Sequence, residues 1–114
     1  MKANEIITVF TQILIENGDI KVCLQGMDDG GCYPNDYRTT KIDLYEDEEG
    51  NTIFVDSGDE TSTVTEVIDL LRGIDGETTV NISYGDSGGS YGGFTDCVDI
   101  FVKEIDGEPY AVIE

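Results

Sequence analysis

The feature that most constrains the fold is a duplication within the chain. Residues 4–56 run parallel to residues 65–113 with small gaps. The matched pairs include Glu5 with Glu66, Gly18 with Gly76, Val22 with Val80, Asp43 with Asp99, and Gly50 with Gly107. In the loops, DDGGCY of the first half stands against DSGGSY of the second. Two copies of one pattern of helix and strands are therefore expected.

Each half is predicted to open with an amphipathic helix. Apolar residues recur at steps of three and four over residues 6–14 and again over residues 64–74, which is the spacing of one helix face. The expected helix ends are an Asn4 cap for the first helix, a capping box from Thr63 to Glu66 for the second, and Gly18 and Gly76 after the C-termini.

Three strands are predicted after each helix. Alternating patterns in DIKVCLQ and TTVNISY indicate one half-buried strand per half, and the remaining segments read as hairpins with glycine in their turns. Because a three-stranded sheet covered by one helix buries little apolar area, we expect the two copies to share a core. The prediction is an α+β fold with two tandem α-β-β-β repeats, antiparallel sheets and pseudo-twofold symmetry. Residues 1–114 are expected to form a single domain, with repeats over 1–57 and 62–114; whether the sheets extend one another or pack through the helices stays open.

The stretch GDSGGSYGGF, Gly85 to Phe94, is similar to the nucleophile loop of chymotrypsin-like serine proteases. A serine hydroxyl needs a neighbouring base, normally histidine, to become a nucleophile, and the chain has no histidine. The loop of the first half has Asp29 where the second half has Ser87. We interpret both loops as glycine-rich turns and expect no enzymatic activity.

Charge is the strongest functional signal in the sequence. Six Lys and Arg residues against 25 Asp and Glu residues give a net charge of −19, beyond the magnitude of about 2–8 usual for a small soluble domain. Direct binding to nucleic acid is not expected, because phosphates require cations to neutralise them. A basic protein partner fits this charge better. A protein that is merely kept soluble by its charge is the alternative.

The acidic residues are densest between positions 46 and 60, in EDEEGNTIFVDSGDE. Carboxylates two apart on a strand lie roughly 6.6 Å apart on one face, so such a row can imitate phosphates. The candidate partner-binding residues in this region are Glu46, Asp47, Glu48, Glu49, Gly50, Asn51, Asp56, Asp59 and Glu60. Asp28, Asp29 and Asp86 in the glycine-rich loops are second-rank candidates.

No cofactor, metal or membrane is expected. The acidic run fails the spacing of an EF-hand loop, and Cys23, Cys32 and Cys97 have neither CxxC spacing nor histidine to complete a zinc site. We interpret them as reduced cysteines. No apolar run approaches the ~20 residues of a membrane span, and no signal peptide is recognisable, so a cytoplasmic location is expected.

The first half resembles a known family over about residues 4–71. A helix opening NEII, the strand DIKVCLQG, a polar loop and the hairpin TKIDLYEDEEGNTIFVDS, followed by acids and another helix, are similar to the small acidic anti-CRISPR proteins of phages and prophages. The resemblance implies a DNA mimic that occupies the PAM-reading cleft of a type II CRISPR nuclease. It also implies that Glu49, Gly50, Asn51 and neighbouring acids contact DNA-reading basic residues. This chain departs from the family where a second helix-and-sheet copy replaces the closing helices.

The sequence therefore favours an inhibitor that binds the basic nucleic-acid cleft of a CRISPR effector nuclease in the host bacterial cytoplasm. Two alternatives stay open. One is an immunity or antitoxin protein that neutralises a basic nuclease toxin. The other is a small-molecule-binding protein that uses the glycine- and tyrosine-rich loops. The oligomeric state is not predicted.

Overall fold

Two helices and eight strands make up the described part of the chain. The computed structural model describes residues 1–24, 38–39, 41–58, 60–84, 93–96, 99–105 and 107–114. The elements are α1 (Ala3–Asn17), β1 (Lys21–Leu24), β2 (Arg38–Thr39), β3 (Lys41–Glu46), β4 (Thr52–Gly58), α2 (Val64–Arg72), β5 (Val80–Tyr84), β6 (Gly93–Asp96), β7 (Ile100–Ile105) and β8 (Glu108–Ile113). The α+β class is thus confirmed.

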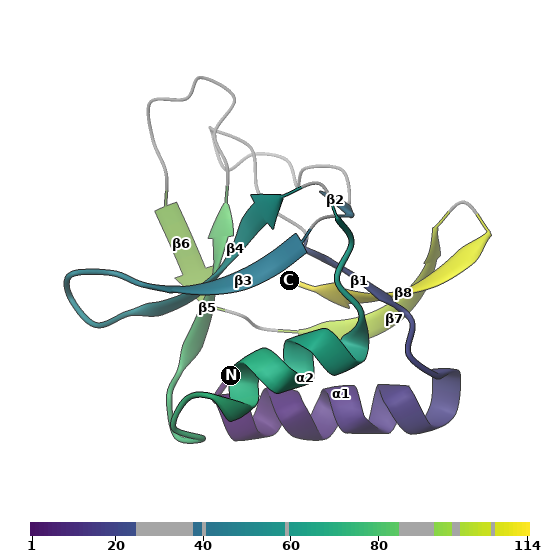
Figure 1. Ribbon diagram of the computed structural model, residues 1–114, viewed down its shortest axis with the longest axis horizontal. Coiled ribbons are helices and arrows are strands. Elements are labelled where there is room, and N and C mark those ends of the chain that lie inside the picture. The colour runs from purple at the N-terminus through teal and green to yellow at the C-terminus, as the bar shows by residue number, and fades with distance from the viewer. Residues whose placement is uncertain (25–37, 40, 59, 85–92, 97–98, 106) are drawn as a thin grey trace.

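The two helices form where the apolar spacing predicts them. Both bury the predicted stripe, with Ile6 and Phe10 of α1 and Val67 and Leu71 of α2 among the fully buried side chains. The helices lie side by side along one side of the strands (Figure 1). Their stripes therefore share one core with residues from both sheets, including Val22, Phe54 and Val80.

The helix ends correct two of the expected boundaries. The Thr63 and Glu66 capping box is present, and Gly18 follows α1 with a φ of 83°, a conformation that glycine adopts without strain. The first helix, however, begins one residue before Asn4, and Glu5 Oε1 accepts a hydrogen bond from the Lys2 backbone N–H at 2.8 Å. Helix α2 ends at Arg72 with Gly73 as its cap, so Gly76 lies beyond its end.

Each sheet combines strands from both halves of the chain. The strand order is β2-β1-β8-β7 in one sheet and β3-β4-β5-β6 in the other. The hairpins β3–β4 and β7–β8 are antiparallel, as predicted. Strand β1 pairs in parallel with β8, and β4 pairs in parallel with β5. The prediction of antiparallel sheets is therefore wrong, and both sheets are mixed.

The parallel pairing of β4 with β5 has its cause at the boundary between the halves. Strand β4 leads into α2, which packs against the strands and returns the chain to β5 beside β4. This is a β-α-β unit, and its crossover makes the two strands parallel. Short strands β2 and β6 also pair with β1 and β5. Four described strands, and not three, therefore follow each helix.

The edge strands β3 and β7 are protected by matched aspartates. Asp43 Oδ1 accepts a hydrogen bond from the Leu44 N–H at 2.8 Å, and Asp99 Oδ1 accepts one from the Ile100 N–H at 2.9 Å. These two aspartates are aligned with each other in the duplication expected from the sequence. An edge N–H that already has an acceptor is a poor template for a further strand.

The buried stripe of α1 predicts a large effect of Phe10→Ala. Phe10 is fully buried, and truncating a buried Phe to Ala typically costs about 3–5 kcal/mol, a large part of the total stability of a small domain. Urea unfolding followed by circular dichroism measures this loss. Ile15→Ala is the control, because Ile15 lies on the same helix and is 74% exposed; we expect its effect to stay within about 0.5 kcal/mol. Equal losses for the two variants would contradict the assigned core face.

Candidate functional site

The acidic hairpin β3–β4 projects from the sheet and ends in a turn built around Asp47 (Figure 1). Asp47 Oδ1 accepts hydrogen bonds from the backbone N–H groups of Glu49 and Asn51, at 2.9 and 2.8 Å, and Oδ2 accepts one from Asn51 Nδ2 at 3.0 Å. Gly50, with a φ of 87°, completes the turn. Residues 47–51 thus form a specific loop, and the two-residue strand spacing expected for the acids does not apply to them.

The hydrogen bonds also change the acidity of Asp47. Donation by the Asn51 side chain, followed by donation from backbone N–H groups of the turn, lowers the pKa of the Asp47 carboxyl below its ordinary value. Asp47 and Asn51 therefore hold the turn in shape. The carboxylates that face outward are those of Glu46, Glu48 and Glu49, all exposed.

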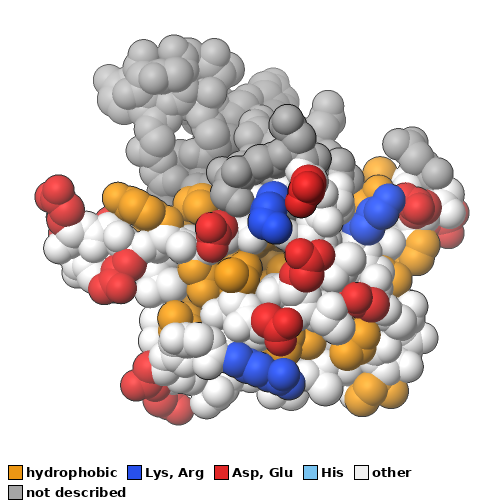
Figure 2. All heavy atoms as spheres, in the orientation of Figure 1, with side chains coloured by type: hydrophobic (Ala, Val, Ile, Leu, Met, Phe, Trp, Pro, Cys, Tyr) orange, Lys and Arg blue, Asp and Glu red, His pale blue; other side chains and the backbone are white. Residues whose placement is uncertain are grey.

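None of the ion pairs found between described side chains involves these three glutamates. The pairs join Lys2 with Glu77 at 2.8 Å, Lys21 with Glu108 at 3.3 Å, Lys41 with Glu66 at 3.9 Å, and Arg72 with Asp69 at 3.8 Å. Figure 2 shows acidic side chains at the tip of β3–β4, over α2 and at the tip of β7–β8. Acids are thus not confined to the hairpin, but on α2 basic side chains lie beside them.

The remaining predicted site residues are only partly placed. Glu60 is exposed in the segment between β4 and α2, and the backbone of Asp56 lies in β4 opposite Ile42 of β3. Asp28, Asp29, Asp59 and Asp86 lie outside the described residues, as does Ser87. The structure places the residues from Glu46 to Asn51 together at the end of the hairpin. Asp56 and Glu60 lie farther along the chain, in β4 and after it.

Sequence reasoning missed an aromatic residue beside the acidic turn. Tyr45 directly precedes Glu46 on β3 and is 54% exposed. Its cross-strand partner is Ile53, which is buried. An exposed tyrosine is a common anchor in protein interfaces. The signal was present in the alternation of IDLYE, which places Leu44 and Tyr45 on opposite faces.

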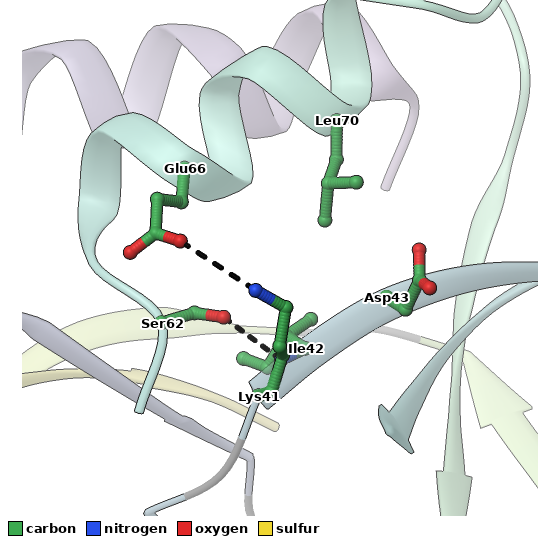
Figure 3. A pocket seen from close by; sticks show the side chains of 6 residues that line it. All are labelled: Lys41, Ile42, Asp43, Ser62, Glu66 and Leu70. Atoms are coloured by element: carbon green, nitrogen blue, oxygen red, sulfur yellow. Dashed lines mark hydrogen bonds and ion pairs between the residues drawn. The ribbon is translucent and has the colours of Figure 1, made fainter. Parts of the chain in front are cut away.

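A small cavity lies at the base of the hairpin, between α2 and β3 (Figure 3). Its volume is about 180 Å³, and it is lined by Lys41, Ile42 and Asp43 of β3, Ser62, and Glu66 and Leu70 of α2. Ser62 is 2% exposed, and its Oγ accepts a hydrogen bond from the Ile42 N–H at 2.9 Å.

A second cavity, of about 200 Å³, is lined by residues 19–21 and 108–109. Both cavities are smaller than the roughly 300–1,000 Å³ of typical small-molecule pockets. The glycine- and tyrosine-rich loops over 25–37 and 85–92, the other candidate for a small-molecule site, lie outside the described residues.

Cys23 is placed as a buried free thiol, whereas Cys32 and Cys97 lie outside the described residues. Burial raises the pKa of Cys23 to about 11, opposed by the positive charge of Lys103. The thiol is therefore protonated at neutral pH and unsuited to nucleophilic chemistry. Within the described ranges, no three Cys, Asp or Glu side chains form a metal-binding group. The described helices also include none that is long and apolar enough to cross a membrane.

The role of Asp47 predicts a specific effect of Asp47→Asn. Because the pKa of Asp47 is lowered on folding, its stabilisation is present above the pKa of an unfolded Asp, about 3.9, and is lost as the pH falls through the lower folded-state value. At pH 7 the variant loses the stabilisation from the carboxylate charge. Its Nδ2 group also takes the place of Oδ2, so that two N–H donors face each other where Asn51 Nδ2 had an acceptor. We expect amide hydrogen exchange at Glu49 and Asn51 to become several-fold faster. Glu48→Gln, in the same turn, serves as the control and leaves exchange unchanged; equal acceleration in both variants would refute a special role for Asp47.

No protein-family model matches the chain, and neither a curated protein nor a solved structure shows significant similarity to it.

Proposed function

We propose that the protein is a non-enzymatic inhibitor that inserts its acidic β3–β4 hairpin into a cationic cleft of a nucleic-acid-handling protein. The observation that carries the proposal is the group of exposed glutamates, Glu46, Glu48 and Glu49, which take part in none of the ion pairs found between described side chains. The backbone of the turn is held in shape by Asp47, so binding does not have to order this backbone, and the ordering cost is limited to the glutamate side chains. Tyr45 adds an aromatic contact beside them.

Electrostatics supports competition with nucleic acid in particular. A net charge of −19 creates a field that steers the protein toward positively charged grooves. Grooves that bind DNA or RNA are lined with Lys and Arg for the same physical reason. Association is then fast and weakens as salt screens the charges.

The proposed target is a CRISPR effector nuclease in a bacterial host cell. This part of the proposal comes from the resemblance of residues 4–71 to small acidic anti-CRISPR proteins, and it assigns the hairpin to the cleft that reads the PAM. Blocking that cleft prevents DNA recognition without any catalytic step. A basic nuclease toxin would present a similar groove and is the competing target.

We further propose that the two halves are tandem repeats with pseudo-twofold symmetry within a single domain. The strands that follow α1 and those that follow α2 take equivalent places in the two sheets. The first strand after each helix lies beside the last strand of the other half: β1 beside β8, and β5 beside β4. The aspartates of the two edge strands support the same view. The β3–β4 turn nevertheless spans residues 47–51, whereas residues 106–107 join β7 to β8. The longer, more acidic turn is therefore the docking element.

Charge removal at the hairpin is the decisive variant. We expect Glu46→Gln/Glu48→Gln/Glu49→Gln to weaken inhibition of DNA cleavage by a guide-loaded type II effector at least about tenfold, mainly through slower association. Asp69→Asn/Asp75→Asn/Glu104→Gln changes the net charge equally at other sites and is the control. Dose–response curves and binding kinetics at two salt concentrations provide the measurement. Undiminished inhibition by the hairpin variant, or equal losses in both triple variants, would refute hairpin docking.

Failure of the wild-type protein to bind the effector at all would exclude this target. Binding of a basic toxin nuclease with the same dependence on the three glutamates would then identify the partner class.

A further inference from the structure

The cavity between α2 and β3 combines an apolar floor with two fixed carboxylates (Figure 3). Leu70, which is half-buried, provides the accessible apolar surface, and the buried Ile42 lies beneath it in the lining. Asp43 and Glu66 stand on different elements, β3 and α2. The volume of about 180 Å³ is too small for a typical organic cofactor and is of the order of one side chain.

Both carboxylates are held by backbone N–H groups through one oxygen only. Asp43 Oδ1 accepts from the Leu44 N–H at 2.8 Å, and Glu66 Oε1 accepts from the Thr63 N–H at 3.2 Å in the capping box of α2. None of the hydrogen bonds or ion pairs found between described residues involves Asp43 Oδ2, and Glu66 Oε2 faces Lys41 Nζ at 3.9 Å. Each carboxylate is thus oriented in advance, with an oxygen left to accept from a ligand.

The chain's own cation shows what chemistry the cavity favours. Lys41 reaches toward Glu66, yet its distance of 3.9 Å is long for a charge-assisted hydrogen bond. The charged groups of the lining are one Lys, one Asp and one Glu, so the cavity is negative overall. The Lys41 and Glu66 side chains are 45% and 50% exposed, so an incoming group can reach the carboxylates from solvent.

We infer that this cavity receives an arginine side chain of the partner protein. An arginine lays its apolar stem along Leu70, and its planar guanidinium donates to Glu66 Oε2 or to Asp43 Oδ2 at the opposite side of the cavity (Figure 3). Arginine fits better than lysine because its fork matches carboxylate geometry and it is more weakly hydrated. The inference rests on the proposed function, since it takes the partner to be the same cationic protein that binds the hairpin on the other end of β3.

Titration of the ¹⁵N-labelled full-length protein with N-acetyl-arginine amide at low ionic strength tests the site. We expect saturable chemical-shift changes at the amides of Ile42, Asp43 and Glu66. N-acetyl-citrulline amide, which has the same shape without the charge, is expected to cause none. Shifts spread evenly over all exposed acids, or equal responses to both compounds, would overturn the inference.

Matched variants separate a binding site from a structural effect. Glu66→Gln keeps the cap, because Gln also serves at this position, and we expect it to weaken arginine binding about three- to fivefold, as for a partly exposed ion pair. Lys41→Gln removes the competing cation and is expected to strengthen binding. Asp69→Asn and Arg72→Gln make the same charge changes elsewhere on α2 and leave binding within about twofold. Weakening by both Glu66→Gln and Lys41→Gln would point to a structural effect and overturn the inference.

The inference and the proposed function fail in different assays. If Glu66→Gln inhibits the effector as well as wild type while the triple hairpin variant does not, the cavity has no role in docking and the hairpin does. If N-acetyl-arginine amide binds the cavity but the hairpin variant inhibits normally, hairpin docking is wrong and the cavity's preference for a guanidinium stands.

Discussion

Parallel pairing between the two halves of the chain is the constraint on which the rest of the structure depends. Strand β1 finds its neighbour in β8, and β5 finds its neighbour in β4, so neither half completes a sheet from its own strands. Backbone N–H and C=O groups in a sheet interior must be paired. The first strand of each half therefore needs the hairpin of the other half. Helices α1 and α2 then cover strands from both halves, and their apolar stripes close one core.

The helices and hairpins were predictable because the residues that determine them are neighbours in the sequence. Apolar spacing fixed both helices, the Thr63 and Glu66 pair fixed the start of α2, and glycine in the turns fixed the hairpins. Strand neighbours were not predictable, because alternation specifies which face of a strand is buried but not which strand lies beside it. For one pair the sequence does contain a signal, because the consecutive strand, helix and strand over residues 52–84 have the form of a β-α-β unit, whose two strands are parallel.

The candidate site shows the same division between local and long-range information. The exposure of Glu46, Glu48 and Glu49 follows from their place at the end of a hairpin. The turn-forming role of Asp47 had a signal in the general tendency of Asp to accept hydrogen bonds from backbone N–H groups two or more residues on, whereas the charge pattern alone predicts a contact residue at this position. The cavity could not be predicted, since Asp43 and Glu66 are brought together only by the packing of α2 on β3.

Strand β3 links structure and proposed function. On one side it pairs with β4, while its edge is protected by Asp43 and by Ser62. Its far end bears the exposed glutamates, and its near end forms a wall of the cavity. One edge strand thus carries both proposed contacts, and its position depends on the pairing of β4 with β5 from the other half.

Nuclear Overhauser contacts between backbone protons test this central pairing most directly. The account predicts contacts between Val22 or Cys23 of β1 and Ala111 or Val112 of β8, and between Phe54 of β4 and Ile82 of β5. Contacts of Cys23 with β4, or of Ile82 with β8, would instead show that each half builds its own sheet and would contradict the account.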